Sequence, residues 1–402
     1  MKNRQVQSVK TRKPSGGRAV VGLFAGVGGI ELGLQRAGFH ASLLCESDPA
    51  AQAVLKSRFP QIPLADDVRE LDELPSDTFL LAGGFPCQDL SQAGPTRGIG
   101  GARSSLVTNV FRLLERFSVP WVLLENVPFM LRLNQGAAMR FITDELERLG
   151  YKWAYRIVDT RAFGIPQRRE RVFLLASSVA DPAVSLFQED AGEMITKNHE
   201  GRACGFYWTE GTRGLGWAVD AVPTLKGGST VGIPSPPAIW LPDGSIVTPD
   251  IRDAERLQGL DVDWTKPAEE VTRSSFRWKL VGNAVTVDVA DWVGKCVLGE
   301  PGQDRPVGPP VRSLGSWPRA AFGSREEGRF EVPVSTWPVR RSPRCLTEYL
   351  EFETRPLSHR AAGGFLKRLK ASTLKCYPTE FLNALERHMV SVAGADLLRE
   401  YA

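Results

Sequence analysis

The chain has 402 residues, enough for two or three domains, and its 42% hydrophobic and 24% charged residues are typical of a globular protein. No apolar run approaches the roughly 18 residues that a membrane span needs, and the N-terminus is too polar for a secretory signal. The six cysteines are never closer than 31 residues apart, which disfavours a disulfide framework and a zinc site. We therefore expect a cytoplasmic protein with no metal ion and no membrane contact.

The net charge of +4 is distributed unevenly along the chain. Residues 1–18 carry +6 and residues 301–402 carry +5, so residues 19–300 carry −7. Basic ends can bind the phosphate backbone of a nucleic acid through counterion release. A solvated N-terminal arm and an ordinary charged surface near the C-terminus explain the same charges equally well.

Residues 19–179 alternate short apolar segments with segments of helical periodicity. The apolar segments predict strands at 19–24, 41–45, 78–82, 121–124, 155–159 and 171–176. Helical spacing predicts helices at 30–37, 49–58, 106–116 and 137–149, and the pattern returns at 252–260 and 285–297. Short buried strands that alternate with helices predict an α/β fold with a doubly wound, mainly parallel sheet.

The amino-acid composition of the chain changes twice after residue 179. Residues 180–250 are rich in Gly, Pro, Thr and Trp, which predicts a smaller, irregular, β-rich domain. Residues 298–402 form a C-terminal extension that is Pro- and Arg-rich at first and helical from residue 345. The extension matches no domain that the sequence lets us name.

The helical part of the extension contains a mixed segment, GGFLKRLKASTL. An apolar helix face is predicted at Phe365, Leu366 and Leu369, with the basic side chains outside, at Lys367, Arg368 and Lys370. This pattern favours a packing helix over an appendage that contacts phosphates.

A glycine-rich segment, Phe24–Gly29 (FAGVGG), follows the first predicted strand and opens a helix. Glycine lets a ligand approach the backbone, and a helix N-terminus offers free N–H groups. Glu46, just past the second strand, is suited to ribose hydroxyls, and Asp67-Val68 to an adenine amino group. The alternative to a role of Glu46 in ribose binding is that Glu46 is only an acidic side chain on the surface at the end of a strand. No phosphate-loop lysine follows, which disfavours ATP hydrolysis.

A second glycine-rich segment, 83–88 (GGFPCQ), follows the strand predicted at 78–82. Open α/β sheets bind ligands at the carboxyl ends of their strands, so Cys87 is placed where a nucleophile is useful. Glu125 ends the next strand, and neighbouring strands would bring it to the same edge as Cys87.

Six motifs occur in a fixed order: FAGVGG, GGFPCQ, ENV at 125–127, QRRER at 167–171, RDAERLQG at 252–259 and GNAV at 282–285. With them the chain resembles the S-adenosylmethionine-dependent DNA (cytosine-5)-methyltransferases of prokaryotic restriction systems, over residues 19–297. The resemblance implies a Rossmann-like methyltransferase domain at 19–179 plus 251–297. Residues 180–250 would then form the target-recognition domain.

The resemblance also implies roles for individual residues. Cys87 would add to C6 of cytosine, Pro86 would order its loop, and Glu125 would bind the N3/N4 edge of the base. Arg169 and Arg171 would support the cysteine loop and the O2 side of the base, and would lower the pKa of the thiol. Positions matching the S-adenosylmethionine site are Phe24, Ala25, Gly26, Gly28, Gly29, Glu46, Asp67, Val68, Asn283 and Val285.

The residues that contact DNA are harder to predict. Thr224 and Leu225 resemble a short Thr-Leu element of the family's recognition region, and the other candidates are Gln88, Ser91, Arg213, Lys226 and Thr230. Tryptophans in this region are expected to pack rather than stack on bases: Trp208, Trp217 and Trp240. Asn283 has an alternative role as a plain cap of the helix predicted at 284–297, which we expect beside the first strand–helix unit.

Three other functions are weighed against DNA methylation. A tRNA cytosine-5 methyltransferase is disfavoured because the Cys-Phe-Thr tripeptide of that branch is absent. A catalytically silent DNA-binding homologue would have no chemical reason to keep Cys87, Glu125 and Arg171. A nicotinamide oxidoreductase is disfavoured because Glu31 replaces the last glycine of the dinucleotide fingerprint. The expected partners are double-stranded DNA and a separately acting restriction endonuclease, with the chain as a monomer.

Overall fold

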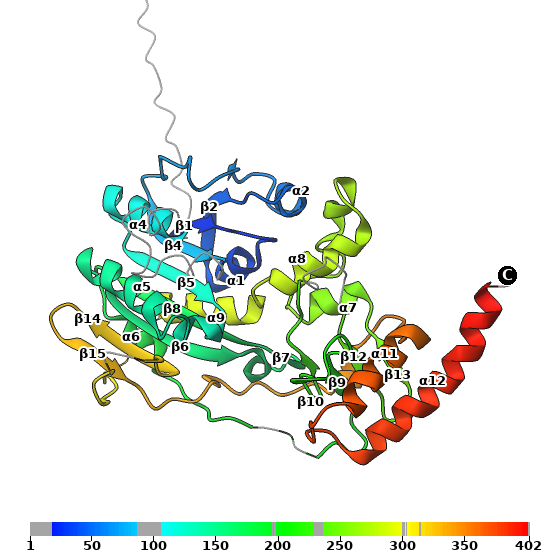
Figure 1. Cartoon of the computed structure of the whole chain (residues 1–402). Helices are drawn as coiled ribbons and strands as arrows, with labels where there is room; N and C mark the ends of the chain where they lie inside the picture. Colours follow the sequence, from blue (N-terminus) through cyan, green and yellow to red (C-terminus); the bar gives the residue numbers. More distant parts are fainter. Residues whose placement is uncertain are drawn as a thin grey trace, which may run out of the picture.

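The computed structural model describes residues 18–86, 106–194, 196, 198–227, 236–299, 302, 304–312 and 315–400, with only the backbone described beyond residue 393. A large α/β unit lies beside a smaller unit built on a short sheet (Figure 1). Within the part of the chain that the structure describes, no helix is both long and apolar enough to cross a membrane.

The large unit is built on a nine-stranded sheet with the order β15-β14-β6-β8-β5-β4-β1-β2-β3. From β5 to β3 all neighbouring strands pair in parallel, whereas β8 is antiparallel to both β5 and β6. This confirms the predicted mainly parallel α/β sheet. Its strands are β1 Arg18–Leu23, β2 Phe39–Cys45, β3 Leu64–Ala65, β4 Thr78–Gly84, β5 Trp121–Asn126, β6 Lys152–Asp159, β8 Glu170–Ser177, β14 Ala320–Ser324 and β15 Gly328–Glu331.

Helices cover both faces of this sheet because its central strands are buried on both sides. The first helix starts after Gly28 (φ 82°) and ends at Gly38 (φ 109°), and the second begins with Pro49 behind an Asp48 cap. The helices and 3-10 helices described between residues 18 and 299, not all of which lie on the sheet, are α1 Gly29–Ala37, α2 Pro49–Arg58, α4 Val107–Arg116, η2 Pro128–Leu131, α5 Ala137–Arg148, η3 Thr160–Phe163, α6 Pro182–Leu186, α7 Ile251–Arg256, η4 Lys266–Glu270, η5 Ser274–Phe276, α8 Arg277–Asn283 and α9 Val287–Leu298.

Helix α9 packs closely against α1, which confirms the expected position of the helix after GNAV. A Cβ on Gly33 of α1 would lie 2.5 Å from Ala290, and one on Gly294 of α9 would lie 2.6 Å from Ala37. Asn283, however, is the last residue of α8, and Thr286 is the N-cap of α9. The alternative prediction that Asn283 caps the following helix is therefore wrong, because two residues separate Asn283 from the N-cap of α9.

The small unit contains a five-stranded sheet with the order β10-β9-β12-β13-β16, and a two-stranded sheet joins β11 to β7. These strands are β7 Gln167–Arg168, β9 Cys204–Phe206, β10 Ala218–Val219, β11 Val222–Pro223, β12 Ala238–Trp240, β13 Ile246–Thr248 and β16 Arg355–Pro356. Three helices follow in the C-terminal part: α10 Leu346–Tyr349, α11 His359–Lys370 and α12 Thr379–Glu400.

The segment 298–402 supplies strands to both sheets. Its β14 pairs antiparallel with β6 at the edge of the large sheet, and its β16 pairs antiparallel with β13 of the small one. Phe365 and Leu369 of α11 are buried, as a packing helix requires. Arg368 does not point outside with its basic neighbours, because its guanidinium donates to the backbone carbonyls of Trp208 and Glu210.

Candidate active site

The glycine-rich loop after β1 is held by the carboxylate of Glu46. Phe24 and Gly26 both have positive φ angles, 53° and 56°, which turn the chain sharply at the end of the strand. Glu46 accepts hydrogen bonds from the backbone N–H groups of Gly26 and Asp48, each at 2.8 Å. On the other side, the indole of Trp264 donates to the carbonyl of Val27 at 2.8 Å. The loop is therefore preorganised, with Glu46 at its open side.

Two cavities, of about 310 and 520 Å³, adjoin this loop and share Phe24, Glu46, Ser47 and Leu106 in their walls. The smaller cavity is lined by Asp67 and Val68, as predicted. The Arg69 side chain, by hydrogen bonding, keeps the pKa of Asp67 below its ordinary value, so this carboxylate is charged. Other predicted residues line the larger cavity: Gly26, Pro86, Glu125, Arg169, Arg171 and Asn283.

The β4–β5 pair brings the start of the cysteine loop next to the ENV motif. Gly84 is in register with Glu125, and a Cβ on Gly84 would lie 3.0 Å from its carboxylate. The amide of Asn126 donates to the carbonyl of Phe85 at 3.0 Å. The described chain ends at Pro86, so Cys87, Gln88 and Ser91 lie outside the described residues.

Glu125 forms an ion pair with Arg171 beneath the larger cavity. Arg171 Nε lies 3.1 Å from Glu125 Oε1, and only 8% of Glu125 is exposed. Burial raises the pKa of Glu125, and the charges of Arg171 and Arg169 oppose this shift without cancelling it. The carboxyl group therefore takes up a proton more readily than an exposed glutamate does.

Arg169 has a different environment from Arg171. Its guanidinium is 1% exposed and donates to three backbone carbonyls, those of Leu225, Gly282 and Ala284, at 3.2, 3.3 and 2.6 Å. These carbonyls belong to the Thr-Leu element and to the GNAV motif. Arg169, in the wall of the larger cavity, thus connects the small unit to the GNAV motif of the large one.

Comparison with protein families matches residues 19–201 to the C-5 cytosine-specific DNA methylases. The chain is also 48% identical over 382 residues to the Type II methyltransferase M2.BsuMI of Bacillus subtilis (strain 168), a match that covers 92% of this chain and 97% of that relative. The chain belongs to the C-5 cytosine-specific DNA methylase family. It is therefore a methyltransferase, and the resemblance seen in its sequence motifs is confirmed.

Other methylases match a shorter part of the chain. Type II methyltransferase M.BanI of Aneurinibacillus aneurinilyticus is 36% identical over 172 residues, which are 41% of this chain and 40% of that relative. Among solved structures, the methyltransferase EhMeth of Entamoeba histolytica aligns with a TM-score of 0.49 and 13% identity, over 71% of this chain and 100% of that one.

Four residues predicted for the cofactor site of this methylase do not line either cavity: Ala25, Gly28, Gly29 and Val285. Gly28 lies against the side chain of Phe59, and Gly29 lies against the backbone of Val285. Ala25 is buried, and its N–H donates to the carbonyl of Cys45. These residues shape the loop by close packing, which explains why glycine or a small side chain stands there.

Four of the predicted DNA-contact residues lie in the described part of the small unit: Arg213, Thr224, Leu225 and Lys226. Thr224 donates to the carbonyl of Arg168, and the N–H of Leu225 donates to the side chain of Gln167. Lys226 pairs with Glu210 and lies 3.6 Å above the ring of Tyr207. Arg213 is exposed, and Thr230 lies outside the described residues. As expected, the tryptophans pack: Trp217 and Trp240 lie 5.0 and 5.7 Å from Phe381.

Sequence reasoning missed residues that position others. Asn126 was quoted within ENV but given no role, although it fixes the entry to the cysteine loop. Lys279, in the wall of the larger cavity, pairs with Asp48 at 3.0 Å, and Trp264 supports the glycine loop. Its place within the ENV motif was a usable signal for Asn126. The contact partners of Lys279 and Trp264 lie more than 200 residues away in the sequence, so no local sequence pattern could predict these contacts.

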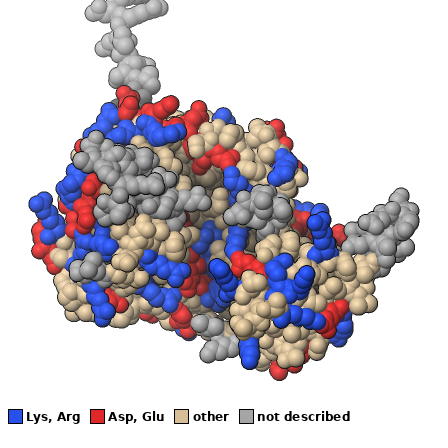
Figure 2. All heavy atoms as spheres, viewed as in Figure 1, with Lys and Arg blue, Asp and Glu red and all other residues tan. Residues whose placement is uncertain are grey.

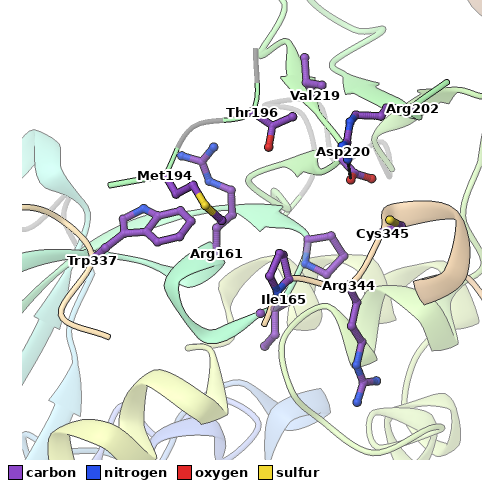
Figure 3. A pocket seen from close by; sticks show the side chains of 13 residues that line it. Arg161, Ile165, Met194, Thr196, Arg202, Val219, Asp220, Trp337, Arg344 and Cys345 are labelled. Carbon is purple, nitrogen blue, oxygen red and sulfur yellow. Dashed lines mark hydrogen bonds and ion pairs between the residues drawn. The ribbon is translucent and has the colours of Figure 1, made fainter. Parts of the chain in front are cut away.

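A further cavity of about 430 Å³ lies away from the motif residues (Figure 3). Its walls come from the η3–β7 region, from residues around β10 and from the segment that contains Trp337 and Cys345. The two arginines at its rim, Arg161 and Arg202, already form ion pairs with Asp159 and Asp220, each at 2.6 Å. None of the described motif residues lines this cavity, whereas Glu46, Glu125, Arg169 and Arg171 line the two cavities described above.

Proposed function

We propose that the chain methylates C5 of a cytosine within a specific double-stranded DNA sequence, with S-adenosylmethionine as the methyl donor. The reaction proceeds through a covalent bond between Cys87 and C6 of a cytosine flipped out of the duplex. The observation that carries this proposal is the pair of adjoining cavities. One wall holds Glu46 at the glycine-rich loop, and another holds the Glu125–Arg171 pair where the cysteine loop begins.

The residues of the smaller cavity fit S-adenosylmethionine. Its acidic lining, with Glu46, Asp66 and Asp67, suits a nucleoside that carries a cationic sulfonium and would repel a phosphate-bearing cofactor. Glu46 can accept hydrogen bonds from ribose hydroxyls, and the Phe24 ring offers an apolar face to the adenine. When bound, the cofactor supplies a methyl group activated by positive sulfur.

The residues of the larger cavity would activate the base. Cys87, as a thiolate, adds to C6, while the Glu125 carboxyl group gives a proton to N3, so that C5 becomes an enamine carbon. A bound sulfonium cofactor would supply the methyl group to C5 and would leave as a neutral thioether, after which C5 would lose its proton to a base. The bond from sulfur to C6 breaks and the thiolate is regenerated as N3 returns its proton. Arg171 holds Glu125 in place and compensates its negative charge while N3 holds the proton.

Charge on the surface supports a DNA substrate. Lysine and arginine side chains lie on both sides of the hollow between the two units (Figure 2). Phosphate groups of a duplex bind such a surface with the release of counterions. The target base must leave the stack to reach C5, because that atom is inaccessible to the thiolate inside a duplex. We also propose that the chain acts as a monomer and that a separate restriction endonuclease cuts the same sequence.

A covalent trap tests the proposal. Duplex DNA that contains 5-fluorocytosine cannot complete the last elimination, because fluorine replaces the proton at C5. We expect a stable adduct on the peptide that contains Cys87, dependent on S-adenosylmethionine and detected by mass spectrometry. An adduct on another cysteine, or none with a DNA that the protein methylates, would refute this mechanism.

A further inference from the structure

The C-terminal extension completes the core of the small unit. Two aromatic rings, Phe365 of α11 and Phe381 of α12, are fully buried and lie 5.0 and 4.9 Å from the ring of Phe206 on β9. Strand β16 continues the same sheet through its pairing with β13. Nε2 of His388, on α12, lies 2.7 Å from the carbonyl oxygen of Leu357, so a hydrogen bond joins α12 to the segment just after β16. Residues 355–393 are therefore part of the body that carries the β9–β10 loop.

The loop between β9 and β10, residues 207–217, is fastened to α11 through its backbone. Arg368 donates from Nη2 to the carbonyl of Trp208 at 2.7 Å and from Nε to the carbonyl of Glu210 at 2.9 Å. Gly211 has φ 116°, and a Cβ there would lie 3.1 Å from the ring of Phe365. One guanidinium thus holds two carbonyls two residues apart, and the next position admits only glycine against the helix.

The tip of this loop is exposed, so the loop tip, and not α11 itself, is placed to contact a ligand. The N–H of Gly211 donates to the carbonyl of Gly214 at 3.0 Å, which closes a tight turn with Thr212 and Arg213 outside. Nε and Nη2 of the half-buried Arg368 are engaged by backbone carbonyls and so are not available to a phosphate group. Arg213 is the side chain of this turn suited to a phosphate oxygen or to the edge of a guanine.

The base of the loop reaches the active site. The hydroxyl of Tyr207 donates to the carbonyl of Thr224 at 2.7 Å, and Glu210 pairs with Lys226. Gly282 of the GNAV motif packs directly on the backbone of Lys226. The loop therefore has one end beside the cavity wall and the other exposed at its tip.

From these contacts we infer that α11 determines DNA specificity indirectly, because Arg368 positions the loop 207–217 whose tip reads the target sequence. The inference rests on the proposed function. A loop held in its binding conformation loses little conformational entropy when it meets DNA, so discrimination between similar sequences depends on the anchor. Arg368 is thus a positioning residue, and Arg213 is the residue through which it acts.

The test compares Arg368→Ala with Lys367→Ala, which removes the same charge from an exposed neighbour on the same helix. The wild-type target is first defined by sequencing of methylated DNA, and each variant is then assayed on duplexes with the target and with single-base changes. We expect the ratio of methylation on target to that on altered sites to fall at least tenfold in Arg368→Ala and to stay unchanged in Lys367→Ala. Cofactor affinity, measured by calorimetry, should be the same in both.

A double variant separates positioning from a general structural role. If Arg368 acts through the loop tip, adding Arg368→Ala to Arg213→Ala should change discrimination little beyond Arg213→Ala alone. Additive losses, or full discrimination in Arg368→Ala, would overturn the inference. Arg368→Lys keeps the charge and one donor nitrogen, and it serves as the test if the alanine variant does not fold. This variant should lose part of the discrimination between target and altered sites. Wild-type discrimination by Arg368→Lys would also refute the inference. A wild-type protein that methylates no DNA would refute the proposed function instead.

Discussion

A buried acid beneath the glycine-rich loop makes stability depend on pH. Glu31 of α1 is 2% exposed, and neither oxygen of its carboxyl group has a hydrogen-bond partner among the described residues. Burial raises its pKa from 4.5 to about 8, and the nearby charge of Glu46 adds to the shift. The side chain is therefore neutral in the folded protein at pH 7 but ionised in the unfolded chain.

The sign of the effect follows from proton linkage. Since the folded state keeps a proton that the unfolded state releases above pH 4.5, the stability contributed by Glu31 is full below that pH and is lost as pH rises to about 8. The loss is about 1.4 kcal/mol per pH unit, and about 5 kcal/mol in total. Well above pH 8 the carboxyl group is ionised in both states and no longer makes stability depend on pH.

Glu31→Gln should remove this dependence, since the amide has the same shape and does not ionise. Urea unfolding of both proteins at pH 6, 7, 8 and 9 measures it. Between pH 6 and pH 8 the free energy of unfolding of the wild type should fall by roughly 2 kcal/mol more than that of the variant. Parallel curves for the two proteins over this range would show that the carboxyl group is ionised in the folded state, contrary to our reasoning.

Three further predictions concern the cavities and the extension. Glu46→Ala should weaken S-adenosylmethionine binding by roughly 1.5–3 kcal/mol per lost hydrogen bond and DNA binding far less; unchanged affinity in calorimetry would show that Glu46 holds the loop without binding the cofactor. Glu125→Gln should lower the methylation rate at least tenfold with DNA affinity retained, and a wild-type rate would exclude proton donation by this residue. Deletion of 301–402 removes strands of both sheets, so the truncated protein should melt earlier or be insoluble; an unchanged melting temperature would contradict the packing.

Much of the large sheet could be predicted because its parallel strands are short, apolar and separated by amphipathic helices. The helix predicted at 49–58 has those bounds in the structure, and the strand predicted at 78–82 is two residues longer. The strands of the extension could not be predicted. Arg355–Pro356 is two residues long, and Ala320–Ser324 lies in a segment rich in Pro and Gly, so pairing with distant strands decides both.

The site shows the same division between local and long-range information. The motifs indicated that Glu125 and Arg171 belong together, and the structure joins them in one ion pair. The three carbonyls held by Arg169 and the two held by Arg368 come from segments more than 50 residues away. Nothing near either arginine in the sequence specifies these acceptors. The packing of the small unit on the large one sets those of Arg169, and the packing of the C-terminal extension within the small unit sets those of Arg368.

Sequencing of bisulfite-treated DNA from cells that express the protein tests the central claim most directly. We expect 5-methylcytosine at one defined duplex sequence in cells with the wild-type protein, and none at that sequence in cells with Cys87→Ala. S-adenosylmethionine binding by the purified variant should be unchanged, since we propose that its site lies at the glycine-rich loop. Equal methylation by the Cys87→Ala variant, or methylated cytosine confined to tRNA in the wild type, would contradict the account.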